Sequence, residues 1–174
     1  VTLVERTLGA VTTAEAGLFI GAQVVGGCLG AVLANLMFDL PALDETLVAV
    51  DGVTLRNGQP VRASGCATLS DARLSTTDPH LFGDPEPFER VRRATKVTRF
   101  GLDALGYARI ATGDLDLVIE SGLKCHDYDA LVAVVRGAGG VIGNWSGGHD
   151  LAGGDVVAAA SAALYDEAVA LLAE

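Results

Sequence analysis

The sequence predicts a layered α/β protein, with an antiparallel sheet over residues 17–77 and then a mostly parallel sheet with flanking helices over residues 88–174. In the first part, short apolar runs are separated by a glycine pair and an Asn-Gly signal, which is typical of strands joined by hairpins. In the second part, strand-like and helix-like runs alternate, which is typical of strands connected by helices. The proline-containing stretch 78–87 is the candidate linker, and 174 residues suit a single domain over 1–174.

The first part is expected to be a meander of short strands. Gly26-Gly27 joins two apolar runs, and Asn57-Gly58 predicts a tight turn. The region 17–40 is apolar, but glycines and polar residues interrupt it, so it favours paired strands over a membrane span. The expected strands lie at 18–25, 29–38, 46–50 and 72–77.

The second part is expected to carry the functional site. Its strands are predicted at 97–100, 115–120, 141–145 and 155–160, and its helices at 88–95, 102–112, 127–136 and 164–173. The first helix holds Arg90, Arg92 and Arg93, and together with the nearby Lys96 and Arg99 they form the one basic cluster of the sequence. This cluster is either a solvated helix face or a patch that attracts a phosphate or an acidic partner.

The net negative charge of the sequence argues against anionic partners. Acidic residues outnumber basic ones by 22 to 12, for a net charge of −10, which argues against non-specific binding to nucleic acid or to an anionic membrane. Such a chain would also repel a phosphorylated substrate unless a cation intervened. The three cysteines show no Cys-x-x-Cys spacing and no signal peptide is evident, so we expect reduced thiols in a cytoplasmic protein.

Asp127 stands out because it follows a predicted strand and opens a predicted helix. Ligands of α/β sheets usually bind at this kind of junction. Aspartate is also one of the preferred residues at the start of a helix, where its side chain accepts a backbone N–H. Spacing and composition therefore leave Asp127 as either a ligand or a helix cap.

Three segments resemble the carboxy-terminal half of the inositol monophosphatase family. They run from Arg99-Phe-Gly-Leu-Asp103 to Glu120, from Gly122 to Asp127, and over Gly-Ala-Gly-Gly-Val-Ile-Gly-Asn-Trp-Ser-Gly-Gly, which ends at residue 148. Leu-Ser-Thr-Thr-Asp-Pro-His-Leu-Phe over 74–82 and the acid at position 103 resemble the histidinol-phosphatase branch more than the inositol branch.

The resemblance implies a sugar-phosphatase-like fold and a Mg²⁺ cofactor. It implies that Asp127 binds metal, and that Glu120 and Asp103 face the substrate alcohol. No residue is assigned as catalytic. The Gly-Glu-Glu and Asp-Pro-Ile-Asp-Gly-Thr segments that supply most of the family's metal ligands do not occur, and their expected place near residues 4–9 reads Val-Glu-Arg-Thr-Leu-Gly. The resemblance therefore implies a fold that is incomplete at its amino terminus.

Two functions remain open at the level of sequence. The first is a Mg²⁺-dependent phosphomonoesterase that acts on histidinol phosphate or a related small alcohol phosphate. The second is a catalytically inactive or partial family member that acts as a binding or assembly protein, an alternative suggested by the missing ligands and a mean hydropathy of +0.40. An uncovered sheet would favour a homo-oligomer in either case.

Overall fold

The computed structural model describes residues 44–174, so the strands expected at 18–25 and 29–38 lie outside the described residues. Residues Glu45–Glu174 form one compact unit that contains two sheets. The predicted layered α/β class is confirmed, with an antiparallel sheet and a mixed sheet. Within the described range, no helix has both the length and the apolar character needed to cross a bilayer.

The smaller sheet is an antiparallel meander whose two turns are encoded locally. Asp51-Gly52 and Asn57-Gly58 connect its strands, and all four residues have positive φ. Such backbone angles produce the tight type I′ turn that matches the twist of a hairpin, and Asn-Gly and Asp-Gly favour it. The strands are β1 (Leu47–Val50), β2 (Val53–Arg56) and β3 (Gln59–Pro60).

The larger sheet has five strands in the order β5-β4-β6-β8-β7. Strand β4 pairs in parallel with β5 and β6, whereas β8 is antiparallel to both β6 and β7. The sheet is therefore mixed, and the expected mostly parallel pairing holds only around β4. The strands are β4 (Arg73–Thr76), β5 (Val97–Phe100), β6 (Leu117–Glu120), β7 (Val141–Gly143) and β8 (Val156–Ala159).

Two features explain the difference from the expected pairing. No helix separates β7 from β8, so the chain turns back through the loop 144–155 and the two strands must be antiparallel. Strand β4, expected in the antiparallel part that ends at residue 77, instead lies inside the larger sheet. Leu74, Ser75 and Thr76 are all buried, as residues of an inner strand covered on both faces usually are.

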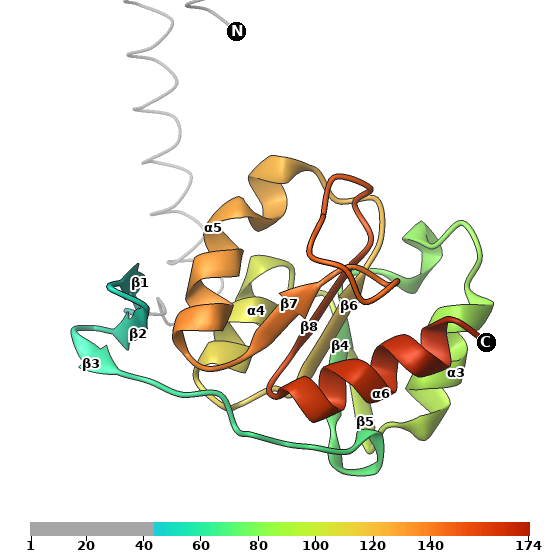
Figure 1. Cartoon of the computed structure of the whole chain (residues 1–174), viewed down its shortest axis with the longest axis horizontal. Helices are drawn as coiled ribbons and strands as arrows, with labels where there is room; N and C mark the ends of the chain where they lie inside the picture. Colours follow the sequence, from blue (N-terminus) through green and yellow to red (C-terminus); the bar gives the residue numbers. More distant parts are fainter. Residues whose placement is uncertain (1–43) are drawn as a thin grey trace, which may run out of the picture. The chain divides into compact units, whose positions relative to one another are not determined.

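Helices cover both faces of the larger sheet (Figure 1). Helices α3 and α6 pack together on one face, and α4 and α5 pack together on the other, where the small sheet lies against α5. In β6, Leu117 and Ile119 join the cluster under α3 and α6, while Val118 joins the cluster under α4 and α5. The helices are α3 (Glu86–Ala94), α4 (Ala104–Ala111), α5 (Cys125–Gly137) and α6 (Ala162–Leu172), with short 3-10 turns at Leu69–Asp71 and Pro79–Leu81.

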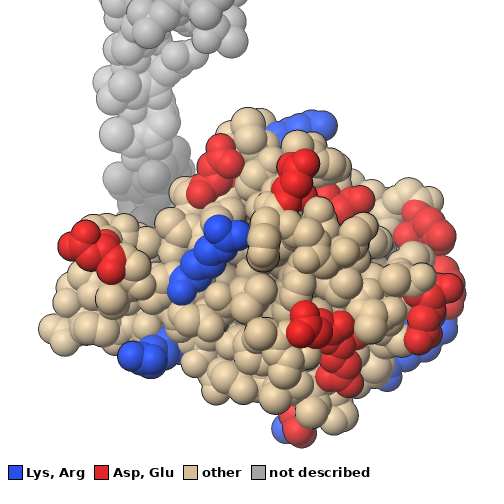
Figure 2. Space-filling view, viewed as in Figure 1, with Lys and Arg blue, Asp and Glu red and all other residues tan. Residues whose placement is uncertain are grey.

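The three arginines of the basic cluster that lie on α3 are engaged within the fold. Arg90 donates from Nε to the carbonyl of Leu171 at 3.1 Å and from Nη2 to that of Leu172 at 3.2 Å, at the end of α6. Arg92 pairs with Glu89 at 2.7 Å, and Arg93 with Glu86 at 3.3 Å. These contacts favour the solvated-face interpretation over a phosphate patch. Basic side chains are also sparse on the face drawn in Figure 2, where acidic groups are spread over several places.

Candidate active site

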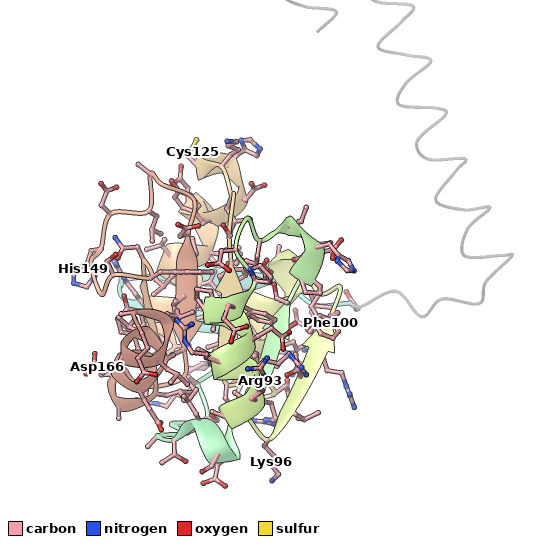
Figure 3. All side chains as sticks on the ribbon, turned by 90° about the vertical axis from the view of Figure 1, so that its right-hand side faces the viewer. Arg93, Lys96, Phe100, Cys125, His149 and Asp166 are labelled. Carbon is pink, nitrogen blue, oxygen red and sulfur yellow. The ribbon has the colours of Figure 1, made fainter. Side chains whose placement is uncertain are left out.

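The carboxyl ends of β4, β5 and β6 meet at one edge of the larger sheet, because these three strands run in parallel. In Figure 3, β5 runs from Lys96 at the bottom to Phe100 higher up, and Cys125, the first residue of α5, lies at the top, beyond that same edge. Ligands of α/β folds usually bind at this edge. The residues that follow the three strands therefore define the candidate site.

Glu120 is the last residue of β6 and is only 4% exposed. Its Oε1 accepts hydrogen bonds from the backbone N–H of Thr77 at 2.8 Å and from the Thr77 hydroxyl at 2.7 Å, and Oε2 accepts one from the Thr76 hydroxyl at 3.1 Å. Burial raises the pKa of Glu120, and the nearby Asp103 adds to this effect, although the threonine hydrogen bonds oppose it. The carboxylate is thus held rigidly, in surroundings that penalise its negative charge.

Asp103 follows β5 and precedes α4 in an unusual backbone conformation. Its φ is +46°, a region that residues other than glycine rarely occupy, and its side chain caps no helix N–H. The preceding turn is fixed because the N–H of Gly101 donates to the carbonyls of Thr76 and Thr77, at 3.2 and 2.9 Å. Strained backbone of this kind concentrates at binding sites, where the surrounding structure enforces it.

Asp127 lies in the first turn of α5, which begins at Cys125 and not at Asp127 as expected. Its Oδ2 accepts the backbone N–H of Lys124 at 2.8 Å, so the carboxylate does stabilise the start of the helix. Its Oδ1 lies 3.6 Å from Nε2 of the exposed His126 and accepts no hydrogen bond within the described residues. Asp127 is therefore a helix-stabilising residue that keeps one oxygen available to a ligand.

The segment between Glu120 and Asp127 is tied to the loop that precedes β8. The N–H of Leu123 donates to the carbonyl of Gly154 at 3.1 Å, and the Ser121 hydroxyl donates to Asp155 at 2.6 Å. A side chain at position 154 would lie 2.6 Å from the Leu123 carbonyl oxygen. Glycine is therefore required for the close approach that fixes this segment.

Asp103, Glu120 and Asp127, the three residues singled out from the sequence, line one cavity of about 290 Å³. No lysine or arginine is among the residues that line it, so its wall is acidic. Thr77 and Tyr107 also line the cavity and were not predicted. Thr77 could have been found as the residue after a parallel strand, whereas a tyrosine in an amphipathic helix gives no signal beyond core packing. The full lining comprises Thr77, Asp103, Ala104, Tyr107, Glu120, Leu123, His126 and Asp127.

The metal-binding capacity of these residues can be judged from their donors. Mg²⁺ prefers several oxygen ligands in octahedral geometry, and Oδ1 of Asp127 is suited to be one of them. Within the described residues, no group of three or more His, Cys, Asp or Glu side chains could hold a metal ion. The described residues of the cavity therefore offer one suitable metal ligand, Oδ1 of Asp127, and do not form a complete metal site.

A second cavity, of about 420 Å³, lies at the opposite edge of the sheet, where β4, β5 and β6 begin. It contains Asp116, which is 2% exposed and pairs with Arg73 at 2.7 Å. Burial raises the pKa of Asp116, but hydrogen bonds from Arg73 and Ser64 outweigh it and hold the pKa below its usual value. Because Arg73 already neutralises the buried charge of Asp116, we interpret this pair as a structural ion pair and not as a ligand site.

Comparison with known proteins places these features in context. The sequence profile of the inositol monophosphatase family matches residues 12–174. The chloroplastic bifunctional phosphatase IMPL2 of Arabidopsis thaliana is 42% identical over 137 residues, which cover 74% of this chain and 40% of that protein. A histidinol-phosphatase of Chlorobaculum parvum is 24% identical over 160 residues, which cover 90% of this chain and 60% of that protein.

Solved structures agree with the sequence comparison. An inositol monophosphatase from Zymomonas mobilis is 34% identical and superposes with a TM-score of 0.71, covering 75% of this chain and 53% of that one. The chain thus spans about half the length of the relatives that it matches, and less of some.

Proposed function

The chain belongs to the inositol monophosphatase family, and from this premise we propose that it forms the substrate-binding side of a Mg²⁺-dependent phosphomonoesterase. The proposed substrate is a small alcohol phosphate, and histidinol phosphate is the first candidate. The observation that carries the proposal is the single acidic cavity that brings together Asp103, Glu120 and Asp127.

The charge of the cavity suggests which part of the substrate it receives. A phosphate dianion would be repelled by three carboxylates, since no basic side chain lines the cavity to offset them. An alcohol that carries hydroxyl or ammonium donors would instead be attracted, because carboxylates accept such hydrogen bonds strongly. We therefore assign the alcohol moiety to this cavity and the phosphate to the side where the metal binds.

Each carboxylate has a distinct proposed role. Glu120 is held in place by two threonines and would accept a donor of the alcohol. Asp103, exposed at the rim, would pair with an ammonium group. Asp127 would offer Oδ1 as one ligand of Mg²⁺, which would neutralise the phosphate and activate a water when bound. The described residues that line the cavity do not form a group that could supply the remaining metal ligands.

The histidinol assignment rests on two supports. The acidic cavity favours an alcohol that bears an amine over a neutral polyol, and the match to the Chlorobaculum parvum histidinol-phosphatase covers 90% of the chain. A relative named inositol-1-monophosphatase, from Mesorhizobium japonicum, is 31% identical over 137 residues. Inositol phosphate is accordingly the second candidate substrate.

The alternative function is a non-catalytic binding or assembly protein. Among the described residues, the small sheet exposes Val48, Val50 and Val53, which are 45%, 51% and 43% accessible. Val50 and Val53 are cross-strand partners, so they share one face of the hairpin. This apolar face would suit pairing with a second copy of the chain, in line with the expected homo-oligomer.

Phosphate release from histidinol phosphate and from inositol phosphate, with Mg²⁺ and with EDTA, tests the proposal. We expect turnover only with Mg²⁺, and a loss of about 100-fold in Asp127→Asn because a metal ligand is removed. Asp129→Asn is the matched control, since it makes the same change at an exposed position of the same helix and Asp129 does not line the cavity. Equal activity in the two variants would remove Asp127 from the mechanism, and no turnover in the folded wild type would favour the assembly function.

A further inference from the structure

The hydroxyl of Tyr107 is a buried polar group that has no hydrogen-bond partner. Tyr107 lies on α4, is 2% exposed, and lines the acidic cavity. Among the described residues, its oxygen and that of Ser75 are the buried side-chain polar atoms that lack a partner. Ser75 lies within β4 and is not among the residues that line the cavity. Of these two described residues, Tyr107 is therefore the one whose unpartnered hydroxyl belongs to a residue of the site.

Such a hydroxyl is costly unless something else satisfies it. A buried polar group that loses its bonds to water without gaining new ones destabilises the folded state, and native structures contain few of them. Tyr165, which is 5% exposed, shows the usual arrangement of a buried tyrosine, since its hydroxyl donates to the carbonyl of Asn144 at 2.9 Å. A phenylalanine at position 107 would fill the same space without this cost.

The acidic neighbours of Tyr107 do not satisfy its hydroxyl. Glu120 accepts its three hydrogen bonds from Thr76 and Thr77 and none from Tyr107. Burial raises the pKa of Tyr107, and the negative charges of Glu120 and Asp127 raise it further. The group therefore remains a neutral hydroxyl that can both donate and accept a hydrogen bond.

We propose that Tyr107 is a binding residue for a protonated amine carried by the alcohol moiety of the ligand, and that this amine supplies the missing hydrogen bond of the Tyr107 hydroxyl. The inference rests on the proposed function, since it concerns the same cavity. An ammonium group suits the acidic lining, where Asp103 is proposed to pair with it, and it can donate to the lone pairs of the Tyr107 oxygen. The acidic lining thus favours an amine-bearing alcohol over one that is purely hydroxylated, and the Tyr107 oxygen supplies an acceptor for the amine.

The test measures binding of the dephosphorylated alcohol to the full chain in EDTA, so that neither metal nor turnover is involved. Histidinol, which carries an amine, and myo-inositol, which does not, are titrated calorimetrically into the wild type, Tyr107→Phe and Tyr165→Phe. We expect histidinol to bind the wild type more tightly than inositol, and Tyr107→Phe to weaken histidinol binding by about five- to tenfold, the equivalent of one hydrogen bond.

Thermal unfolding of the same unliganded proteins supplies the structural control. Tyr107→Phe should leave the midpoint unchanged or raised, because it removes an unpartnered hydroxyl, whereas Tyr165→Phe should lower the midpoint and leave histidinol binding unaltered. Unchanged histidinol affinity in Tyr107→Phe, or a midpoint that falls as in Tyr165→Phe, would overturn the inference. If the wild type bound inositol more tightly than histidinol, or bound neither compound, the proposed ligand class would be wrong.

The outcomes separate this inference from the proposed function. A chain that binds histidinol through Tyr107 but releases no phosphate under any condition would support the inference and count against the phosphatase. A chain that releases phosphate while Tyr107→Phe leaves both KM and histidinol affinity unaltered would do the reverse.

Discussion

Glu120 combines two properties that usually exclude each other, a charged group and nearly complete burial. Three hydrogen bonds from the end of β4 make this arrangement possible, because they replace part of the lost hydration. They do not replace all of it, since the pKa of Glu120 stays above its usual value. The ionised carboxylate therefore lowers the stability of the folded state, and a hydrogen-bond donor from a ligand would offset this cost.

The raised pKa of Glu120 predicts how stability depends on pH. The folded state holds the proton of Glu120 more tightly than the unfolded state does, so its contribution is fully present below the ordinary glutamate pKa and is lost as the pH rises through the raised value. Urea unfolding from acid to neutral pH should show the wild type losing stability relative to Glu120→Gln. Glu86→Gln, at the surface, is the control. If the difference in unfolding free energy between the wild type and Glu120→Gln did not change with pH, the expected cost of ionising Glu120 would be contradicted.

Some residues of the candidate site were predicted from the sequence and others were not. Asp103, Glu120 and Asp127 were identifiable because their spacing within a family-like segment was intact, and all three line one cavity. Tyr107 could not be identified, because the absence of a hydrogen bond is a property of three-dimensional surroundings. The same is true of the contact between Glu120 and the threonines, which lie 43 and 44 residues away in the chain.

Helix α5 connects the site to the small sheet by an unusually close approach. The Thr54 hydroxyl donates to the carbonyl of Val134 at 2.7 Å. A side chain at Gly137 would lie 2.6 Å from that hydroxyl oxygen and 3.0 Å from the Thr54 backbone nitrogen. Thr54 is fully buried and hydrogen-bonded, so it cannot move aside easily.

Gly137→Ala should therefore destabilise the protein by about 1 to 2 kcal/mol, even though alanine favours a helix more than glycine does. Gly153→Ala is the control, because a methyl group there meets no atom within 4 Å. Chemical denaturation measures both changes. If Gly137→Ala proved as stable as the wild type, the packing of β2 on α5 would be looser than described.

The elements that local sequence controls were predicted well, and those that depend on distant partners were not. Asn57-Gly58 predicts its turn because few residue pairs adopt the required positive φ, and α4 and α6 follow from apolar periodicity. Long-range pairing determines which sheet contains β4. It also determines that β8 lies between β6 and β7 and runs antiparallel to both. No local pattern distinguishes a buried strand in one sheet from a buried strand in another.

The whole molecule carries a net charge of −10, and its candidate site is also acidic. An acidic protein that handles a phosphate ester needs a cation to bring the two together, which agrees with the metal dependence proposed from the family. The chain spans between 40% and 60% of the relatives compared above. In the proposed function, the described residues would supply a binding surface for the alcohol and one candidate metal ligand, Asp127.

The most direct test of this account is a two-dimensional amide NMR titration of the 17.8 kDa chain with histidinol in EDTA. We expect the largest shifts at the residues that line the acidic cavity, with Thr77, Asp103, Tyr107 and Glu120 foremost. Shifts confined to the opposite edge of the sheet, around Arg73, Lys96 and Asp116, would contradict it. So would the absence of any shift at millimolar histidinol, because a cavity that does not bind the alcohol does not fit the substrate side of the proposed phosphatase.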